Sequence, residues 1–423
     1  MIIKKVFSLE VSRVHTLNIT RQLNNEQLTI LNHLTYSASK LWNVSNYEVM
    51  QRNINPNKID VQMKNNFWFK NLHSQSAQAV CQKLSIAWDN FFKHYTKTEG
   101  FRCSPLRSEH TKKPKFQPKD GHFPVKWKKN GFKIIDNKLR LSLSKQTKNY
   151  LKEKHGIESK YLWIRLPKIL SLNTMKIKEV EIVPHDIYGK RYFILHLIYK
   201  KKITPLTFNN EKVMAIDLGI KNLATTVIQN EKQPYIFNGK TLVSKLRWFN
   251  KTKAKLMSIL SKQKLKTSKR LSKLTVKEKN YVKDYIHKVS RMIVELAKND
   301  KVSKIVIGEM NKGITSMNIG KINNQKLHRI PFGKLIQMIQ YKAVGYGITV
   351  EQVNESYTSQ TCSNCGIVKK SNRKYRGLYI CSKCGLIINA DVNGALNILK
   401  KVVPNPSKDR DSGLGNPIRI YSL

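Results

Sequence analysis

Long apolar runs are missing from this sequence of 423 residues, in which no stretch approaches the roughly 18 consecutive apolar residues of a membrane-spanning helix. The run from Tyr192 to Tyr199 is short, and His196 interrupts it. Residues 1–10 contain two lysines but no apolar stretch as long as a secretory signal, so we expect an opening strand there. These absences argue against a membrane or secreted protein and predict a cytoplasmic one.

Acidic residues are also scarce, at 27 Asp and Glu against 78 Lys and Arg, which gives a formal net charge of +51. Such an excess opposes folding by self-repulsion unless a polyanion neutralises it, and the common intracellular polyanions are nucleic acids. The 40% hydrophobic and 9% aromatic content is enough for packed cores, so the chain is not a disordered basic tail. We therefore expect a nucleic-acid partner and, from the length, about two to four domains.

Cysteine is rare as well, because six residues in this length are too few for a disulfide scaffold. Four of them form two Cys-x-x-Cys pairs, and a glycine follows each pair. This spacing predicts a tetrahedral structural Zn²⁺ site, whereas a redox dithiol needs only one such pair at a helix start. Cys81 and Cys103 remain as ordinary thiols. The expected zinc ligands are Cys362, Cys365, Cys381 and Cys384.

Hydrophobic periodicity predicts different architectures in the two halves of the chain. Helical stripes cover residues 25–50 and 74–95, a Pro- and Lys-rich extended connection covers residues 103–119, and short strands fill residues 126–201 as a small barrel or sheet. After a linker at residues 206–210, strands and helices alternate, which is typical of an α/β sheet. The expected strands there are residues 212–217, 223–228, 234–238, 304–309 and 348–354, and the expected helices are residues 241–298, 331–345 and 390–400.

Carboxylates stand at the ends of these elements. Asp217 and Glu309 end predicted strands, and Asp391 begins a predicted helix. Taken singly, Asp217 is more typical of a turn residue. The helix dipole by itself favours a carboxylate such as Asp391 in the first turn of a helix. Together they can meet at one edge of a sheet, and phosphodiester hydrolysis needs divalent ions bridged by carboxylates. The three therefore predict a metal-dependent nuclease site.

Four motifs, in order, resemble the TnpB family of transposon-encoded RNA-guided DNA endonucleases, which are related to type V CRISPR effectors. They are Ile-Asp-Leu-Gly-Ile-Lys-Asn-Leu-Ala at residues 216–224, Ile-Val-Ile-Gly-Glu-Met-Asn at 305–311, Tyr-Thr-Ser-Gln-Thr-Cys-Ser-Asn-Cys-Gly at 357–366, and the second cysteine pair with Asn-Ala-Asp-Val-Asn-Gly-Ala-Leu-Asn-Ile at 389–398. In the first half the similarity is looser and covers residues 74–92 and 113–116. One departure is Gly308, where a larger apolar residue is common.

The resemblance implies a RuvC-like RNase H fold in which Asp217, Glu309 and Asp391 are the catalytic ligands of two Mg²⁺ ions. It implies a noncoding guide RNA from the transposon end and a double-stranded DNA target beside a short duplex motif as partners. The implied domains are a wedge-type β-barrel (residues 1–25 and 101–205), an inserted helical recognition domain (26–100), a RuvC-like nuclease domain (206–357 and 387–401), a zinc ribbon (358–386) and a flexible tail (402–423).

Nucleic-acid contacts are expected on two surfaces. Glutamines can contact adenine bidentately, so Gln75, Gln78 and Gln82 are candidates on the second helix, although an exposed polar face is the simpler interpretation. The basic stretch at residues 251–301 fits a backbone clamp, with a solvated helical face as the alternative. Its candidate contacts are Arg247, Lys251, Lys253, Lys255, Lys262, Lys264, Lys266, Lys269 and Arg270.

These features favour RNA-guided double-stranded DNA cleavage, in which base pairing supplies sequence choice. One alternative is an RNA-guided repressor that does not cut, but such a protein is expected to have lost one of the carboxylates. The other is a resolvase or transposase that acts without RNA, which the absence of an evident helix-turn-helix and the extent of the basic surface disfavour.

Overall fold

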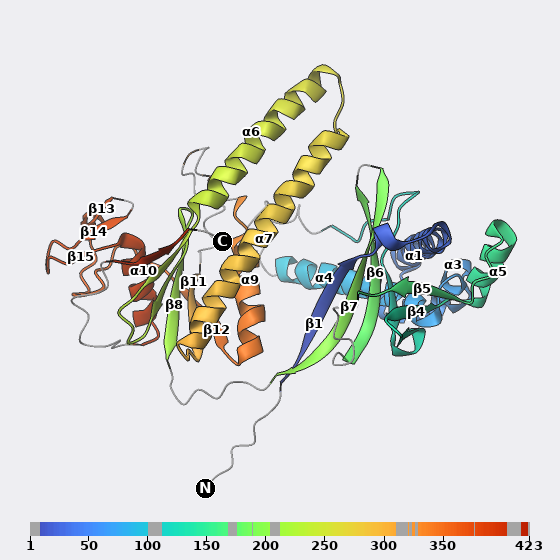
Figure 1. Cartoon of the computed structure of the whole chain (residues 1–423), viewed down its shortest axis with the longest axis horizontal. Helices are drawn as coiled ribbons and strands as arrows, with labels where there is room; N and C mark the ends of the chain where they lie inside the picture. Colours follow the sequence, from blue (N-terminus) through green and yellow to red (C-terminus); the bar gives the residue numbers. More distant parts are fainter. Residues whose placement is uncertain are drawn as a thin grey trace, which may run out of the picture. The chain divides into compact units, whose positions relative to one another are not determined.

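A computed structural model describes residues 9–99, 112–167, 176–187, 189–203, 212–309, 320, 324–325, 329–375, 377–403 and 416–421. The expected thiol Cys103 and the expected linker at residues 206–210 lie outside these ranges. The chain divides into two compact units, one formed by Glu10–Lys201 and the other by Lys202–Leu423 with the first nine residues (Figure 1). No helix in the described ranges is long and apolar enough to span a bilayer.

The first unit contains two long helices close to the expected ranges, whereas most of the range expected for an opening strand, residues 1–10, lies outside the described residues. A capping box starts α1, because the Asn24 side chain accepts from the backbone N–H of Gln27 while the Gln27 side chain accepts from that of Asn24. The helix ends where Asn53 adopts a left-handed φ of 51°. The helices are α1 (Asn25–Arg52), α2 (Ile59–Gln62), α3 (Phe67–Lys70), α4 (Ser74–Glu99) and α5 (Lys145–His155).

Two sheets complete this unit, one four-stranded with the order β1-β7-β6-β2 and one three-stranded with the order β3-β4-β5. The indole N–H of Trp127 joins them by donating to the carbonyl of Ser142 at 3.1 Å. Strand pairing thus gives two separate sheets among the described residues, and the barrel remains a prediction. The strands are β1 (Leu9–Asn18), β2 (Val125–Lys128), β3 (Phe132–Ile135), β4 (Lys138–Ser142), β5 (Tyr161–Arg165), β6 (Lys176–Ile187) and β7 (Lys190–Ile203).

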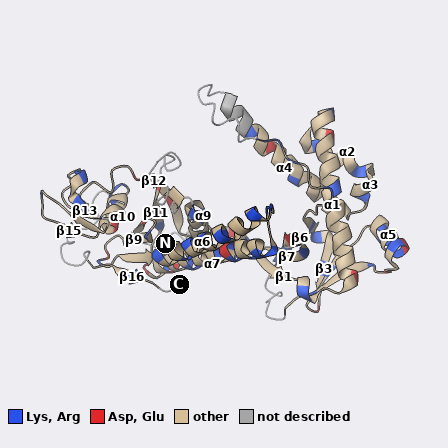
Figure 2. Cartoon of the chain, turned by 90° about the horizontal axis from the view of Figure 1, so that it is seen from above, with Lys and Arg blue, Asp and Glu red and all other residues tan. Residues whose placement is uncertain are grey.

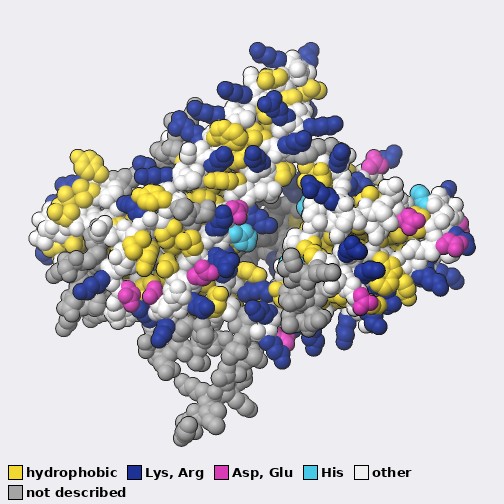
Figure 3. All heavy atoms as spheres, in the orientation of Figure 1, with side chains coloured by type: hydrophobic (Ala, Val, Ile, Leu, Met, Phe, Trp, Pro, Cys, Tyr) yellow, Lys and Arg dark blue, Asp and Glu magenta, His cyan; other side chains and the backbone are white. Residues whose placement is uncertain are grey.

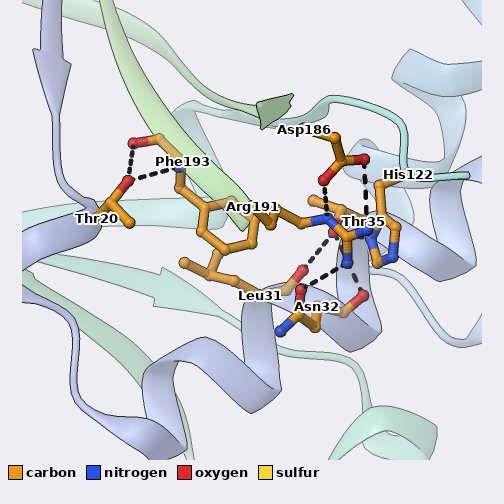
Figure 4. Close-up of polar contacts among 8 residues, drawn as sticks. All are labelled: Thr20, Leu31, Asn32, Thr35, His122, Asp186, Arg191 and Phe193. Atoms are coloured by element: carbon orange, nitrogen blue, oxygen red, sulfur yellow. Dashed lines mark hydrogen bonds and ion pairs between the residues drawn. The ribbon is translucent and has the colours of Figure 1, made fainter. Parts of the chain in front are cut away.

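One continuous hydrophobic core joins α1 and α4 to both sheets, so the helices and strands of the first unit pack as a single body. A polar network reinforces the contact of α1 with the β6–β7 hairpin (Figure 4). The Arg191 guanidinium donates to Asp186 at 2.8 Å and to Asn32 of α1 at 3.0 Å. Next to it, Thr35 bonds His122 at 2.7 Å, and burial followed by the Arg191 charge lowers the pKa of His122 to about 4.

The extended segment at residues 112–124, which follows the expected Pro- and Lys-rich connection, runs along α1. Polar side chains of α1 donate to its backbone carbonyls: Trp42 to Lys115 at 3.0 Å and Asn46 to Pro114 at 2.9 Å. Because this segment forms no ladder of its own, these bonds satisfy backbone groups that would otherwise lack partners. The family-like residues 113–116 are therefore held in a defined extended conformation.

The second unit contains a six-stranded sheet with the order β12-β11-β8-β9-β10-β16. β8 pairs antiparallel with β9 and parallel with β11, and β11 pairs parallel with β12, so β8, β11 and β12 end at the same edge. The strands of this sheet are β8 (Val213–Leu218), β9 (Asn222–Ile228), β10 (Tyr235–Asn238), β11 (Lys304–Glu309), β12 (Thr349–Asn354) and β16 (Ile418–Ile420).

Helices cover both faces of this sheet. On one face α7 and α9 pack on Met214, Ile216, Ile305 and Ile307, and on the other α10 packs on alternating residues such as Ala215 and Val306 (Figure 1). This alternation is that of strands buried on both faces, and it confirms the expected α/β sheet. The helices are α6 (Lys240–Lys262), α7 (Lys269–Asn299), α9 (Phe332–Ala343) and α10 (Ala390–Lys400).

The expectation of a flexible tail is wrong for residues 416–421. There, β16 adds to the sheet edge by parallel pairing, with Tyr235 opposite Ile418 and Phe237 opposite Ile420. The sequence does not predict this strand, because three strand residues are too few to show hydrophobic alternation. A smaller three-stranded sheet holds the cysteine pairs and consists of β13 (Arg373–Tyr375), β14 (Leu378–Ile380) and β15 (Ile387–Ile388).

Candidate active site

A polar pocket opens at the sheet edge where β8 and β12 end and α10 begins. Three acidic residues line it: Asp217 of β8, Asp391 in the first turn of α10, and Glu355, which directly follows β12. Exposed Lys221, Lys240 and Arg419 also line it. We call this site the acidic pocket. Its carboxylate centre and basic lining suit a phosphate-containing substrate held near a cation.

Glycines make room for the acidic side chains. A Cβ atom on Gly394 of α10 would lie 2.8 Å from an Oδ of Asp217, and a Cβ atom on Gly308 of β11 would lie 2.9 Å from an Oε of Glu355. Real Cβ atoms essentially never approach oxygen so closely. Both carboxylates therefore lie against glycine backbone, and a larger residue at either position would require the neighbouring side chain to shift.

Asp391 is held by partners from two directions. Asn389 caps α10 by accepting from the backbone N–H of Asp391 at 3.0 Å. The Asn222 side chain donates to one Asp391 carboxylate oxygen at 2.6 Å, and Arg373 of β13 donates to the other at 3.2 Å. The carboxylate is therefore fixed in place, and Arg373 brings a positive charge into the pocket.

The Asp217 carboxyl has a strongly perturbed environment. Burial raises its pKa well above the ordinary value, and the negative charges of Asp391 and Glu355 add to this, while Arg373 opposes it. Like charges gathered in a buried site destabilise each other unless a cation neutralises them. Such a site is typical of metal-binding and catalytic centres.

Glu309, the third residue of the expected triad, ends β11, and the residues that directly follow it lie outside the described ranges. Among the described residues, those that line the acidic pocket do not include it. Successive residues of a strand point to opposite faces. On β8, Asp217 therefore shares the α10 face with Ala215. Asp217 and Asp391 therefore meet in the pocket, and the role of Glu309 as a third ligand stays a prediction.

The donor set of the acidic pocket fits a hard divalent cation. Carboxylate oxygens are the ligands that Mg²⁺ prefers, and Mg²⁺ is usually bound by one or two carboxylates together with substrate phosphates. Asp217 and Asp391 face the pocket, and the space at Gly394 positions Asp217 beside the helix that carries Asp391. These two residues would hold the cation.

The four cysteines of the expected zinc ribbon come together as predicted. Their sulfur atoms all lie within 4.8 Å of one another, a separation that allows them to bind one metal ion. Each pair forms the same turn: Gly366 donates to the Cys362 carbonyl and Gly385 to the Cys381 carbonyl, both at 3.0 Å. These glycines have φ of 75° and 70°, the left-handed region that favours glycine.

The cysteine cluster is fastened to α10, which carries Asp391. Asn393 accepts from the backbone N–H of Ser363 at 2.9 Å and donates to the Thr361 carbonyl at 2.8 Å. Asn397 donates to the same carbonyl at 2.7 Å. In addition, Arg373 of β13, in the same ribbon, donates to Asp391. Folding of the ribbon and geometry of the pocket are therefore coupled.

Helices α6 and α7 form an antiparallel pair, which we call the basic hairpin (residues 240–299). Residues 240–277 contain 13 Lys and Arg and no Asp or Glu. Figure 2 marks Lys and Arg positions along the ribbons of both helices, and Figure 3 shows Lys and Arg side chains gathered over this part of the surface. Of the expected contact residues, the exposed ones are Arg247, Lys251, Lys255, Lys262, Lys264, Lys266, Lys269 and Arg270.

Lys253 differs from the other candidates of the basic hairpin. Its side chain is only 18% exposed and forms an ion pair with buried Glu278 of α7, which also pairs with Arg329 at 2.6 Å. Lys253 therefore joins α6 to α7. Sequence spacing alone gives no sign of this partner, because the two residues lie on different helices.

The three glutamines of α4 have different surroundings. Gln82 is exposed and accepts a hydrogen bond from Lys128 at 3.1 Å. Gln75 and Gln78 are partly buried. The side-chain amide oxygen of Gln75 is buried without a hydrogen-bond partner among the described residues. Base contact by these residues remains a prediction, and Gln82 is the most accessible of the three.

Comparisons with known proteins find family models and relatives that match this chain. A model of the Cas12f1-like TNB domain matches residues 332–398, and one described as a probable transposase matches residues 196–313. A TnpB-like protein of Methanocaldococcus jannaschii is 31% identical over 208 residues, which cover 48% of this chain and 73% of that protein. The CRISPR-associated endodeoxyribonuclease Cas12f1 of Sulfoacidibacillus thermotolerans is 28% identical over 254 residues, 57% of each chain.

Among solved structures, the cryo-EM structure of a Cas12f1–sgRNA–target DNA complex matches with a TM-score of 0.61 at 18% identity, covering 88% of this chain and 82% of that one. At this identity the likeness shows a shared fold.

Proposed function

Because this chain belongs to the TnpB family, we propose that it is an RNA-guided double-stranded DNA endonuclease that cleaves in the acidic pocket with Mg²⁺. A transposon-derived noncoding RNA and a short target-adjacent motif would direct it, and the four cysteines would hold one structural zinc. The observation that carries the proposal is the convergence of Asp217 and Asp391 in a pocket lined by basic side chains.

The chain's own residues have distinct tasks in this mechanism. Asp217 and Asp391, with Glu309 as the predicted third ligand, would hold the cation, and Asn222 orients Asp391 through its 2.6 Å hydrogen bond. Lys221, Lys240 and Arg419 would position backbone phosphates, since Lys and Arg bind phosphate oxygens without reading sequence. A divalent cation held there would supply activation of a water and stabilisation of the leaving oxygen. Arg373 adds positive charge where negative charge develops.

The nucleic acid would be held by the basic hairpin, whose exposed cations follow one another without acidic interruption. Such a surface binds phosphates with a strong dependence on salt. The first unit, with Gln82 accessible on α4, would read the target-adjacent motif. In this division of labour, base pairing to the RNA selects the target and the protein reads shape and the short motif.

The proposal is tested with two plasmids that differ only in the segment matching the RNA copurified with the protein. Each plasmid is incubated with Mg²⁺ and with protein that carries or lacks that RNA. Selective cutting of the matching plasmid, only with RNA, is expected. Equal cutting of both plasmids, or efficient cutting without RNA, would favour a resolvase-like nuclease. RNA-dependent binding without cutting would favour a repressor.

A further inference from the structure

A cavity open to solvent lies beside the acidic pocket, at the start of the basic hairpin. Lys240, the first residue of α6, lines both this cavity and the acidic pocket. The two are therefore neighbours within one compact unit, and a chain-like ligand can extend from one to the other past Lys240. We call this site the tryptophan cavity. Its described lining residues are Lys240, Thr241, Ser244, Lys245 and Trp248 of α6 and Tyr281 of α7.

Trp248 contributes an aromatic ring that the protein's own core does not cover. The buried side of α6 follows Leu242, Leu246 and Phe249, at the spacing of one helix face. Trp248 lies one position before Phe249, off this face, and 45% of its surface is exposed. Its ring nevertheless contacts the fully buried Phe249 ring edge to face, with the ring centroids 4.9 Å apart. A core residue thus holds the indole in place without covering it, as a fixed stacking surface requires.

The charges around this ring indicate a polyanionic ligand. No Asp or Glu is among the described residues that line the tryptophan cavity, whereas Lys240 and Lys245 are. The Lys245 ammonium lies over the Trp248 ring, 4.7 Å from its centroid, so a cation and an aromatic face are offered at the same place. Single-stranded nucleic acid matches both, because its bases stack on aromatic side chains while its phosphates bind lysines. In a duplex the bases stack on one another, so the base that Trp248 binds must be unpaired.

Resting on the proposed function, we propose that Trp248 is a stacking site for one unpaired base of the DNA strand that enters the acidic pocket. In this arrangement Lys240, which lines both cavities, binds a phosphate between the stacked base and the bond to be cleaved. Trp248 is a positioning residue, because it lies outside the acidic pocket and acts by fixing the register of the strand. Every base has a flat aromatic face, so the site does not read sequence.

Photo-cross-linking tests this site directly, with the full-length protein freed of nucleic acid and kept without Mg²⁺. The probe is a single-stranded oligonucleotide of thymidines in which one base is replaced by iodouracil, which couples on irradiation to an aromatic side chain stacked on it. Mass spectrometry of the digested protein should find the cross-link at Trp248, and Trp248→Tyr should keep a cross-link at that position. Cross-links confined to other residues would overturn the proposal.

Affinity measurements separate stacking of a base from binding of phosphates. A second oligonucleotide of the same length lacks its bases and keeps its phosphates. Trp248→Leu should weaken binding of the thymidine oligonucleotide by about 5- to 100-fold and leave binding of the abasic one unchanged. Met257→Ala is the matched control, because Met257 is also exposed on α6, at 58%, but lies outside the tryptophan cavity. Equal weakening for both oligonucleotides, or a wild-type dimer that Trp248→Leu dissociates, would assign Trp248 another role and overturn the proposal. The unfolding midpoint verifies that each variant is folded.

Cleavage by the RNA-loaded protein tests the link to the acidic pocket. Trp248→Leu should spread cutting over several neighbouring bonds, because a strand without a stacked base can slide, whereas Trp248→Tyr should restore the wild-type cut position. Unchanged cut positions in Trp248→Leu would overturn the link. Asp217→Asn distinguishes this proposal from the proposed function, since it should abolish cutting and keep the Trp248 cross-link. Cutting by Asp217→Asn at the wild-type rate would refute the proposed active site, whereas absence of the Trp248 cross-link in a protein that does cut would overturn the stacking site alone.

Discussion

The acidic pocket and the basic hairpin belong to one compact unit and use charge in opposite ways. In the pocket, a few carboxylates are gathered at fixed positions where glycines make room for them. On the hairpin, 13 cations between residues 240 and 277 are spread mainly over exposed surface. In the pocket, the effect of a charge depends on its exact position. On the hairpin, the effect depends on how many charged residues are present. A single substitution should therefore have a large effect on function in the pocket. On the hairpin, each substitution should have a small effect that adds to the others.

The largest expected effect is that of Asp217→Ala on cleavage. Removing this carboxylate should lower the RNA-guided cleavage rate by on the order of 10² to 10³-fold or more, because it removes charge at the reacting centre. Binding of target DNA should change little, because the basic hairpin is intact. Cleavage kinetics and a filter-binding assay measure the two quantities. Asp284→Asn, an exposed residue of α7, is the control. Near wild-type cutting by Asp217→Ala would contradict the assignment of the pocket.

A slightly smaller effect is expected from the cysteine cluster, which supports the pocket from outside. Wild-type protein should contain about one zinc per chain by elemental analysis, and Cys384→Ser should lose it, because metal binding supplies the folding free energy of so short a ribbon. Cleavage should then fall as well, since Asn393 and Arg373 lose their fixed positions. Ser382→Ala, in the same turn, should keep both. Zinc-free wild-type protein with full activity would contradict this coupling.

The basic hairpin should respond in proportion to the number of charges removed. Replacing Lys262, Lys266 and Lys269 with Gln should lower the slope of log affinity against log salt by about 3, or about 1 for each phosphate that is no longer neutralised. Lys253→Gln should leave this slope unchanged and lower the unfolding midpoint, because Lys253 pairs with buried Glu278. Salt titrations of RNA binding and thermal unfolding separate these outcomes. A slope change in Lys253→Gln would place that residue on the binding surface.

The smallest expected effect is a pH dependence of stability without divalent ions. The pKa of Asp217 is raised in the folded protein, so the folded state holds its proton more strongly than the unfolded state. Its contribution to stability is present at low pH and is lost as the pH rises through the raised pKa. Asp217→Asn should therefore unfold at a higher temperature than wild type at pH 8, by about 2–4 °C, and at nearly the same temperature at pH 4. Adding Mg²⁺ should stabilise only the wild type.

Local patterns in the sequence were enough to predict many of the helices and strands of this protein and its cysteine cluster. The spacing of the cysteines predicted the cluster, helical periodicity predicted α1, α4 and α10 closely, and apolar runs predicted β8, β11 and β12. These features depend on residues near one another in the chain, where side-chain geometry and backbone preference act directly. The excess of positive charge likewise required only counting.

Tertiary structure alone decided which charged residues meet. Asp217 meets Asp391 in the acidic pocket because β8 ends at the sheet edge where α10 begins, although the two residues are far apart in the chain. Glu355 enters it because β12 lies beside β11 and Gly308 leaves room, and Lys253 finds Glu278 because α6 packs on α7. Each of these contacts joins residues far apart in the chain, and local periodicity carries no information about strand neighbours or helix packing.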